Sequence, residues 1–334
     1  MAQAIGALAG MQAQEPRPPF IGLWSRVAGF APEQLLPALR GGEVVRGPLF
    51  RATLHVVAAS DWATFRPLLQ PVLSRALRGL GKRAEGIDLD AVGATARALL
   101  SAAPRTAAQL RALLREAHPE HDERVLGYAA RTGVPMTMVA TGDRYGFPRE
   151  AQFSLAEPKP PLGSAEDLVL RYLGAFGPAG VADAQEWSGL SGLAPAFAAL
   201  RDRLTIFTDE RGRECFDLPG APRPDPATPA PARYLPEFDN LMLGHADRTR
   251  LIAEKHRRHL TTKNLRVNAI ALNDGEACAT WSVKRSAKAA TLELAPFERL
   301  AKRALAELEA VALTLLEATE TAAKLAFAVA PQPR

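Results

Sequence analysis

The feature that most constrains the fold is a recurring order of three helical segments followed by a β-hairpin. In the first complete copy, the apolar periodicity predicts three helices and then two β-like runs around a Gly-Asp turn, over residues 90–102, 104–117, 121–134 and 135–156. The second copy repeats the order, with its hairpin around an Arg-Gly pair, over residues 165–177, 178–190, 194–204 and 205–218. This layout is typical of the winged helix, so the chain is predicted to carry tandem winged helices.

Residues ahead of these copies fit an incomplete first copy. A short helix is predicted over 32–41, a hairpin around a Gly-Pro turn over 44–59 and a helix divided by prolines over 60–83. A further helix is predicted over 2–11, stopped by the prolines that follow. The predicted domains are a first winged helix that is short at its N-terminus, a second, a third, a Pro/Ala linker and a C-terminal domain, at 1–83, 84–158, 159–218, 219–233 and 234–334.

The C-terminal part differs in pattern from the copies. Several short β-like runs precede a long helix predicted over 297–327. We expect a small β-barrel-like domain closed by this helix, which makes the whole chain an α+β protein.

Positive charge is concentrated in two places, although the formal net charge of the 334 residues is only +5. We predict that both clusters contact DNA phosphates. The first cluster comprises Arg75, Arg78, Lys82 and Arg83. The second comprises Arg248, Arg250, Lys255, Arg257, Arg258, Lys263 and Arg266. Each cluster alone fits a solvated helix face equally well, and the winged-helix pattern favours nucleic acid. Such contacts would position the protein without reading sequence.

Two cysteines far apart in the sequence, Cys215 and Cys278, do not suggest a disulfide framework. The apolar N-terminus is short and lacks a basic region, so it does not resemble a signal peptide. No apolar run is long enough for a membrane span. We therefore expect a monomeric cytoplasmic protein of the bacterial nucleoid, with no membrane contact.

Most familiar reaction motifs are missing from the sequence. The pairs His118/His121 and His256/His259 have no third ligand pattern for zinc, and GLGKRAEG lacks the spacing of a phosphate loop. Neither a GxSxG elbow nor a cysteine–histidine motif occurs. A metal or a cofactor is therefore not expected, and His55 alone reads most simply as a hydrogen-bonded histidine within a sheet.

Two glutamines stand on alternate residues in GMQAQEPRPPF, at Gln12 and Gln14. On a helix such positions lie about 200° apart, whereas in an extended chain they point to the same side. The nearby prolines favour the extended form, so both amides can reach one pocket. From spacing alone, two solvated glutamines at a helix end remain the simpler reading.

The stretch GMQAQEPRPPFIGLWSRV closely resembles the segment that bears the QΦQ catalytic motif of AlkZ-like winged-helix DNA glycosylases. Further matching stretches follow in the same order, so the resemblance covers nearly the whole chain; they are LFRATLHVVAASDW, RYLGAFGPAGVADAQEWSGL, LPEFDNLMLGHADRTRLI and NAIALNDGEACATWSV.

The resemblance implies three tandem winged helices in a concave body, a C-terminal β-barrel, and removal of alkylated purines from double-stranded DNA, including N7-linked interstrand crosslinks. The motif glutamines would be Gln12 and Gln14, with Ala13 between them. A sister branch, YcaQ-like, has aspartate at the second position, so Gln14 places the chain with the AlkZ-like branch. We also expect Arg51 and His55 among the DNA-binding residues.

Relatives usually carry more helix ahead of this segment, which is why the first winged helix is expected to be short. The reaction that the resemblance implies is monofunctional hydrolysis, in which the two amides orient water and stabilise an oxocarbenium-like sugar. The alternative is a non-catalytic winged-helix DNA-binding protein or transcriptional regulator, in which the glutamines are structural.

Overall fold

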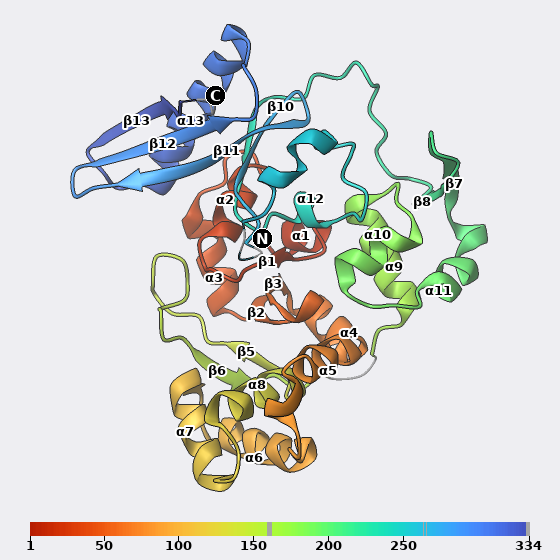
Figure 1. Cartoon of the computed structure of the whole chain (residues 1–334), viewed down its shortest axis with the longest axis vertical. Helices are drawn as coiled ribbons and strands as arrows, with labels where there is room; N and C mark the ends of the chain where they lie inside the picture. Colours follow the sequence, from red (N-terminus) through yellow and green to blue (C-terminus); the bar gives the residue numbers. More distant parts are fainter. Residues whose placement is uncertain (159–161, 263, 265, 332–334) are drawn as a thin grey trace. The chain divides into compact units, whose positions relative to one another are not determined.

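The computed structural model describes residues 1–158, 162–262, 264 and 266–331. Helices and strands are both present, and the chain separates into two compact units (Figure 1). Unit 1 contains Met1–Pro16 and Leu35–Pro219, and unit 2 contains Arg17–Gln34 and Gly220–Arg334. The sequence gives no indication that residues 17–34 group with the C-terminal part of the chain.

The first part of unit 1 is a small three-stranded sheet with helices around it. Its strands are β1 (Met11–Gln12), β2 (Val44–Pro48) and β3 (Leu54–Ala58), in the order β1-β3-β2 with both pairs antiparallel. Its helices are α1 (Ala2–Ala7), α3 (Leu35–Arg40), α4 (Ala59–Leu68) and α5 (Gln70–Arg78), with short 3-10 turns η2 (Phe50–Ala52) and η3 (Gly81–Ala84). The predicted hairpin and the proline-divided helix are both present, but the position of the turn is wrong. Gly47 and Pro48 lie within β2 and pair with β3, and the chain turns over residues 49–53.

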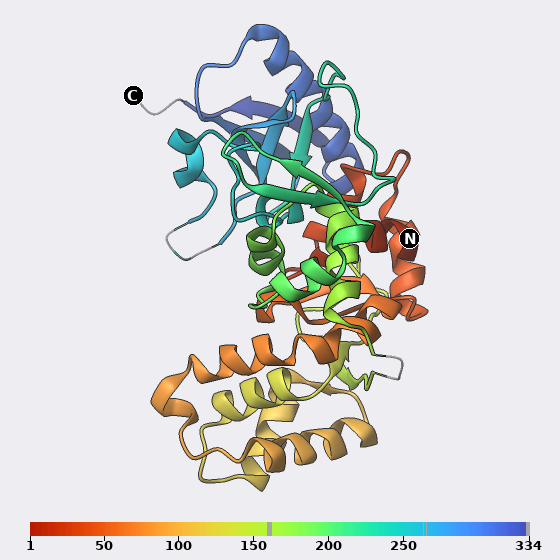
Figure 2. The same ribbon diagram turned by 90° about the vertical axis from the view of Figure 1, so that its right-hand side faces the viewer.

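The second part has the predicted order of three helices and then a pair of strands. The helices are α6 (Leu89–Ala102), α7 (Ala107–Ala117) and α8 (Glu123–Gly133), and the strands β4 (Arg105–Thr106), β5 (Met136–Met138) and β6 (Gln152–Leu155) form a sheet in the order β4-β6-β5. Helix α7 begins at a capping box, in which Thr106 and Gln109 satisfy each other's backbone amides. The three helices lie together in yellow and orange (Figure 2). They share one apolar core with strands of the sheet.

The third part repeats that order. It contains α9 (Ala165–Phe176), α10 (Val181–Ser188), α11 (Ala194–Ala199), η4 (Arg201–Arg203) and the antiparallel pair β7 (Thr205–Thr208) and β8 (Glu214–Asp217). Its aromatic core includes Tyr172, Trp187 and Phe197, and this core is continuous with Phe50 and Phe65 of the first part. The winged-helix assignment of the three parts, and the domain boundaries drawn from it, stay predictions.

Unit 2 is an open five-stranded sheet with a long helix packed on it. The strands are β9 (Arg233–Leu235), β10 (Ile270–Asn273), β11 (Glu276–Arg285), β12 (Ala289–Pro296) and β13 (Lys324–Val329), in the order β13-β12-β11-β10-β9. The other elements are α2 (Pro18–Trp24), η1 (Pro32–Gln34), α12 (Asn240–Leu243), η5 (Glu254–His259) and α13 (Lys302–Thr319).

The expected β-barrel is wrong for the described residues, because these strands do not close on themselves. Strands β9 and β13 lie at opposite edges of the sheet. Leu308, Ala312 and Leu315 of α13 pack in the same cluster as Leu292 and Leu294 of the sheet. The helix therefore covers an apolar face that a barrel would bury by closure.

The predicted helix over 297–327 is also too long. Helix α13 ends at Thr319, and β13 follows it and pairs in parallel with β12. Leu325 and Phe327 of β13 pack against the core of unit 2. Pairing and burial override the helical periodicity that the sequence suggests.

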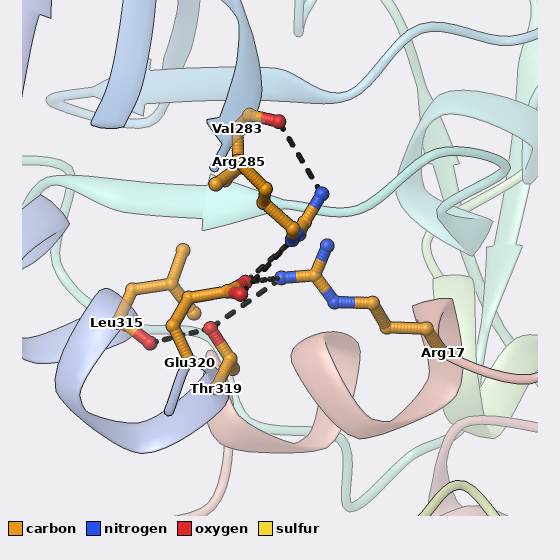
Figure 3. A network of polar contacts seen from close by, with 6 residues as sticks. All are labelled: Arg17, Val283, Arg285, Leu315, Thr319 and Glu320. Carbon is orange, nitrogen blue, oxygen red and sulfur yellow. Dashed lines mark hydrogen bonds and ion pairs between the residues drawn. The ribbon is translucent and has the colours of Figure 1, made fainter. Parts of the chain in front are cut away.

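The segment 17–34 is attached to unit 2 by a buried carboxylate. Glu320 accepts from Arg17 at 2.5 Å and from two nitrogens of Arg285 at 2.8 and 2.9 Å (Figure 3). Arg17 Nη2 lies 3.5 Å from the Thr319 hydroxyl, and that hydroxyl donates to Leu315 O. In the same segment, Arg26 forms a bidentate pair with Asp239 at 2.7 and 2.9 Å.

Candidate active site

A turn at Ala9 and Gly10 brings the glutamine segment onto the sheet. Helix α1 ends at Ala7, well before the prolines, and Ala9 and Gly10 both have positive φ, at 51° and 85°. A Cβ at Gly10 would lie 2.4 Å from Val57 Cγ1, so only glycine fits there. The helix predicted over 2–11 is thus too long, and its stop is this turn.

Met11 and Gln12 form strand β1, which confirms the extended backbone expected at Gln12. Met11 pairs with Val56, Gln12 pairs with His55, and Ala13 N donates to Leu54 O at 2.7 Å. The Gln14 amide oxygen accepts from Leu54 N at 3.4 Å, which is a long hydrogen bond. The prolines are not the cause of the extended form, because Pro18 and Pro19 begin helix α2.

The two glutamines differ in exposure. The Gln12 side chain is buried, with 7% of the residue exposed, whereas Gln14 and the neighbouring Glu15 are exposed. Each amide oxygen accepts a hydrogen bond from the β2–β3 turn region, Gln12 from Arg51 and Gln14 from Leu54. The turn thus holds the Gln12 amide inside the unit, while the Gln14 amide at the surface makes one long contact with it.

Arg46 holds the backbone of this segment from the other side. Its Nε donates to Ala13 O at 2.9 Å and its Nη2 to Gln14 O at 3.1 Å. The guanidinium carbon lies 4.9 Å from the centre of the Phe147 ring. Burial lowers the pKa of Arg46 to about 10, against the opposing charge of Glu15, so the group stays charged at neutral pH. Sequence reasoning missed Arg46, and an arginine within an alternating apolar strand is the signal that it left unused.

The turn between β2 and β3 is built from left-handed residues without glycine. Arg51 and Ala52 have φ of 53° and 59°, and Thr53 N donates to Phe50 O at 3.1 Å to close the turn. Such a conformation costs roughly 1–2 kcal/mol at a residue other than glycine. Strain of this kind persists where the surroundings fix it, and it often marks a functional site.

The side chain of Arg51 extends from this turn to Gln12. Its Nη2 donates to the Gln12 amide oxygen at 3.0 Å, and its Nη1 donates to the carbonyl of Trp187. Gly189, with φ of 80°, packs behind the turn, since a Cβ there would lie 3.3 Å from Arg51 Cα. Trp187 and Gly189 fall in the matching stretch QEWSGL, but their contact with the turn is visible only in the structure.

His55 lies directly across the sheet from Gln12. Because Ala13 N donates to Leu54 O, the pair of Gln12 and His55 is a non-hydrogen-bonded pair, in which side chains approach closely. The ring is 2% exposed and meets the Phe50 ring edge-on at 5.2 Å.

The protonation of His55 follows from its contacts. Nδ1 lies 3.1 Å from Thr53 O, and a carbonyl can only accept, so Nδ1 carries the proton. Burial first, and then the charge of Arg51, lower the pKa of His55 to about 3. The imidazole is therefore neutral at physiological pH.

The structure places Arg51 and His55 next to the glutamine segment. Their predicted contact with DNA stays a prediction. The residues of the first basic cluster are all exposed, at the end of α5 and in η3, and they are Arg75, Arg78, Lys82 and Arg83. Arg75 also donates to Gly189 O at 3.3 Å.

The second basic cluster lies in unit 2, in η5 and the loops on either side of it. Several of its charges are paired within the protein: Lys255 with Glu298, Arg257 with Glu254, and Arg266 with Glu237. Arg248 donates to His245 O, and Arg258 contacts His259. Arg250 is exposed, and Lys263 lies outside the described residues. DNA contact by this cluster stays a prediction.

Several other features bear on the expected chemistry. Within the described ranges, no three His, Cys, Asp or Glu side chains gather as a metal site requires. Cys215 and Cys278 are free thiols. No helix among the described residues has the length and apolar character needed to cross a membrane.

The family model described as "DNA glycosylase AlkZ-like" matches residues 5–318 of the chain. Among solved structures, the DNA glycosylase AlkZ of Streptomyces sahachiroi is similar, with a TM-score of 0.79 and 20% sequence identity over 98% of this chain and 93% of that one. None of the curated protein sequences compared with the chain matches it. The family match covers far more than half of the residues and supports an enzyme over a DNA-binding regulator. The chain belongs to the AlkZ-like family of DNA glycosylases.

Proposed function

We propose that the protein is a monofunctional DNA glycosylase that removes N7-alkylated purines, including those in interstrand crosslinks, and that Gln12 and Gln14 position the attacking water. The observation that carries the proposal is the hydrogen bonding of the two amides. The Gln12 oxygen accepts from Arg51, which orients this buried amide before DNA arrives. The exposed Gln14 oxygen accepts a longer hydrogen bond from Leu54 N, which keeps it near the same turn.

An N7-alkylated purine suits such a site because the base already carries positive charge. When the bond between C1′ and N9 breaks, its electron pair returns to the purine ring, and the base leaves neutral without a general acid. Water adds to C1′, and its proton passes to solvent. A cationic lesion therefore needs positioned water more than it needs acid catalysis.

The ionisable groups near the motif fit this reaction. His55 is neutral and tied to Thr53 O, so it is a poor proton donor. Glutamine does not titrate and cannot act as a conventional base. The first lysine in the sequence is Lys82, so no lysine adjoins the motif along the chain to form the Schiff base of a lyase.

The charge of Arg51 disfavours the positively charged, oxocarbenium-like sugar that forms in this reaction. This charge lies one hydrogen bond from Gln12 and disfavours a second cation nearby. In the proposal a DNA phosphate beside the lesion offsets that charge, which is the DNA contact predicted for Arg51. The exposed Gln14 faces solvent, which supplies the water, and a lesion at the surface need not be flipped into an enclosed pocket.

The test uses duplex DNA with one N7-methylguanine, incubated with the protein and then heated in alkali to cut at abasic sites. Wild type is compared with a Gln12→Ala/Gln14→Ala double variant and with Gln152→Ala, an exposed glutamine on β6, as the matched control. We expect scission by wild type and by the control alone. Scission by the double variant would place the chemistry elsewhere.

A crosslinked duplex forms the second arm of the experiment. Release of one strand from the other by wild type would support the crosslink part of the proposal. Absence of reaction on both substrates would contradict the proposed glycosylase activity and leave a DNA-binding protein.

A further inference from the structure

The second part of unit 1 contains a hollow lined by three arginines. Its volume is about 190 Å³, and its wall includes Arg111 of α7 and Arg124, Gly127, Tyr128 and Arg131 of α8. Residues 124, 127, 128 and 131 share one face of α8, while Val125, Leu126, Ala129 and Ala130 of the same helix are buried. The arginine side of the hollow is therefore distinct from the buried face of α8, whereas the core residues Leu110, Met136 and Phe153 form its apolar wall. Among the described residues that line the hollow, none belongs to the glutamine segment.

The second feature of the hollow is the positive charge of its three arginines. Within the part of the chain that the structure describes, none of Arg111, Arg124 and Arg131 forms an ion pair, and no acidic side chain lines the hollow. By contrast, Arg97 in the same part of the unit pairs with Glu157 at 2.8 Å. Like charges that converge without a partner are the usual arrangement around a bound anion.

The aliphatic stem of Arg111 passes over α8 at a glycine. A Cβ at Gly127 would lie 2.5 Å from Arg111 Cγ and 2.9 Å from Cδ, so the arginine stem crosses the helix where only glycine allows it. Its Nε is buried and has no hydrogen-bond partner among the described residues. This Nε is therefore out of reach of a ligand in the hollow, and any contact of Arg111 with an anion is made by its terminal Nη atoms.

The rest of the wall suits a compact oxyanion. Arg131 lies 5.0 Å from the centre of the Tyr128 ring, which restricts where its charge can point. Leu110, Met136 and Phe153 supply apolar surface that lowers the local dielectric and strengthens charge attraction. The volume lies below the roughly 300–1,000 Å³ of pockets that hold drug-sized ligands. A single phosphate group is a better match than a whole nucleotide.

We propose that the hollow between α7 and α8 binds a phosphate group, supplied by the DNA backbone. The DNA source rests on the proposed function, whereas the phosphate chemistry rests on the arginines alone. Each guanidinium offers paired donors that match phosphate oxygens. The contact would hold the duplex without selecting a base.

The test measures binding of an undamaged duplex by fluorescence anisotropy at salt concentrations of about 50–200 mM. An Arg124→Gln/Arg131→Gln variant should show a log–log salt dependence that is shallower by about 0.9 for each phosphate that it no longer neutralises. Arg97→Gln removes the same kind of charge, already paired with Glu157, and should leave the slope unchanged. Equal slopes for all three proteins would overturn the DNA source.

A second variant separates a built site from loose surface charge. Gly127→Ala keeps the net charge but displaces the Arg111 stem, so it should also flatten the salt dependence. Arg111→Met, which keeps most of the stem, replaces it if circular dichroism shows that Gly127→Ala is not folded. A slope like that of wild type in the folded variant would show that the arginines form an ordinary solvated face.

A final arm uses inorganic phosphate against chloride at equal ionic strength and follows the melting temperature. A rise for wild type that disappears in the arginine variant, with unchanged DNA binding, would assign the hollow to free phosphate and contradict the DNA source. No rise and no change in DNA binding would overturn the site altogether. Excision of N7-methylguanine by wild type is measured separately, so a failure of the proposed function is distinguishable from a failure of this site.

Discussion

Replacing Arg51 by methionine tests whether this residue acts through Gln12. The variant keeps most of the side-chain volume but removes the donor to the Gln12 amide oxygen at 3.0 Å and the donor to Trp187 O. Without Arg51, the amide can rotate and exchange its oxygen and nitrogen positions. We therefore expect slower chemistry at saturating protein, together with the weaker DNA binding that follows from losing the proposed phosphate contact.

The magnitude follows from the kind of bond that is removed. A hydrogen bond to a charged donor contributes about 1.5–3 kcal/mol. If the transition state requires the amide orientation that this bond fixes, the single-turnover rate should fall by roughly 10- to 150-fold, since each 1.36 kcal/mol is a factor of ten. Removal of the hydrogen bond to Trp187 O should also lower the melting temperature.

The assay separates two roles for Arg51. Single-turnover excision of N7-methylguanine gives the chemical rate, and anisotropy with the same duplex gives the dissociation constant. A residue that only contacts phosphate would weaken binding and leave the saturated rate unchanged. That outcome would refute the positioning role and support the simple DNA contact predicted from the sequence.

A double-mutant cycle sharpens the test. If Arg51 acts through Gln12, Arg51→Met should cost little further rate in a Gln12→Ala background. Additive losses would mean that the two side chains act independently, although they are joined by a hydrogen bond.

Further predictions concern pH, lesion charge and the turn before β1. The excision rate for N7-methylguanine should change little between about pH 6 and 9, because His55 has a pKa of about 3 and stays neutral; a sigmoid limb with a pKa near 4–7 would indicate a carboxylate or histidine base. In the unfolded chain this histidine takes up a proton near its ordinary pKa of 6.5, so the free energy of unfolding should decrease as the pH is lowered from about 6.5 to 3. Thermal unfolding would show this decrease, which should be less steep in His55→Asn. Uracil in duplex DNA should not be released, and efficient release would contradict the proposed dependence on a cationic base. Gly10→Ala should destabilise by about 2–5 kcal/mol in urea, from the left-handed backbone and the clash with Val57 Cγ1, whereas Gly42→Ala, with φ of 74° and open space, should cost about 1 kcal/mol; similar losses would show that the clash is relieved cheaply.

Local periodicity was enough to predict the elements whose cores are made by neighbouring segments. Helix α7 is marked by its threonine cap and by Leu110 and Leu114, and the structure has both features. The β2–β3 hairpin is likewise set by alternation around a turn. In these elements propensity, patterning and packing favour the same structure, which makes a prediction from one sequence reliable.

Long-range pairing was beyond the sequence. The residues after Glu320 keep a helical apolar pattern but form β13, because pairing with β12 buries Leu325 and Phe327. The roles of Arg46 and Arg51 likewise depend on distant acceptors. Arg46 donates to Ala13 O, and Arg51 donates to the Gln12 amide and to Trp187 O. The spacing of Gln12 and Gln14 was enough to identify them as a motif. It could not predict which groups donate hydrogen bonds to their amides.

The anchoring of residues 17–34 in unit 2 limits how the protein can be divided. A fragment ended at the Pro/Ala linker would keep Gln12 and Gln14 but lack Glu320, the acceptor of Arg17, and the apolar cluster that holds Ile21. Helix α2 would then expose its apolar face to solvent. Arg17, which directly precedes the helix and lies three residues after Gln14, would lose its carboxylate partner. The C-terminal part of the chain therefore cannot be replaced by that of a relative on its own. A chimera needs to take Arg17–Gln34 and Gly220–Arg334 from the same parent.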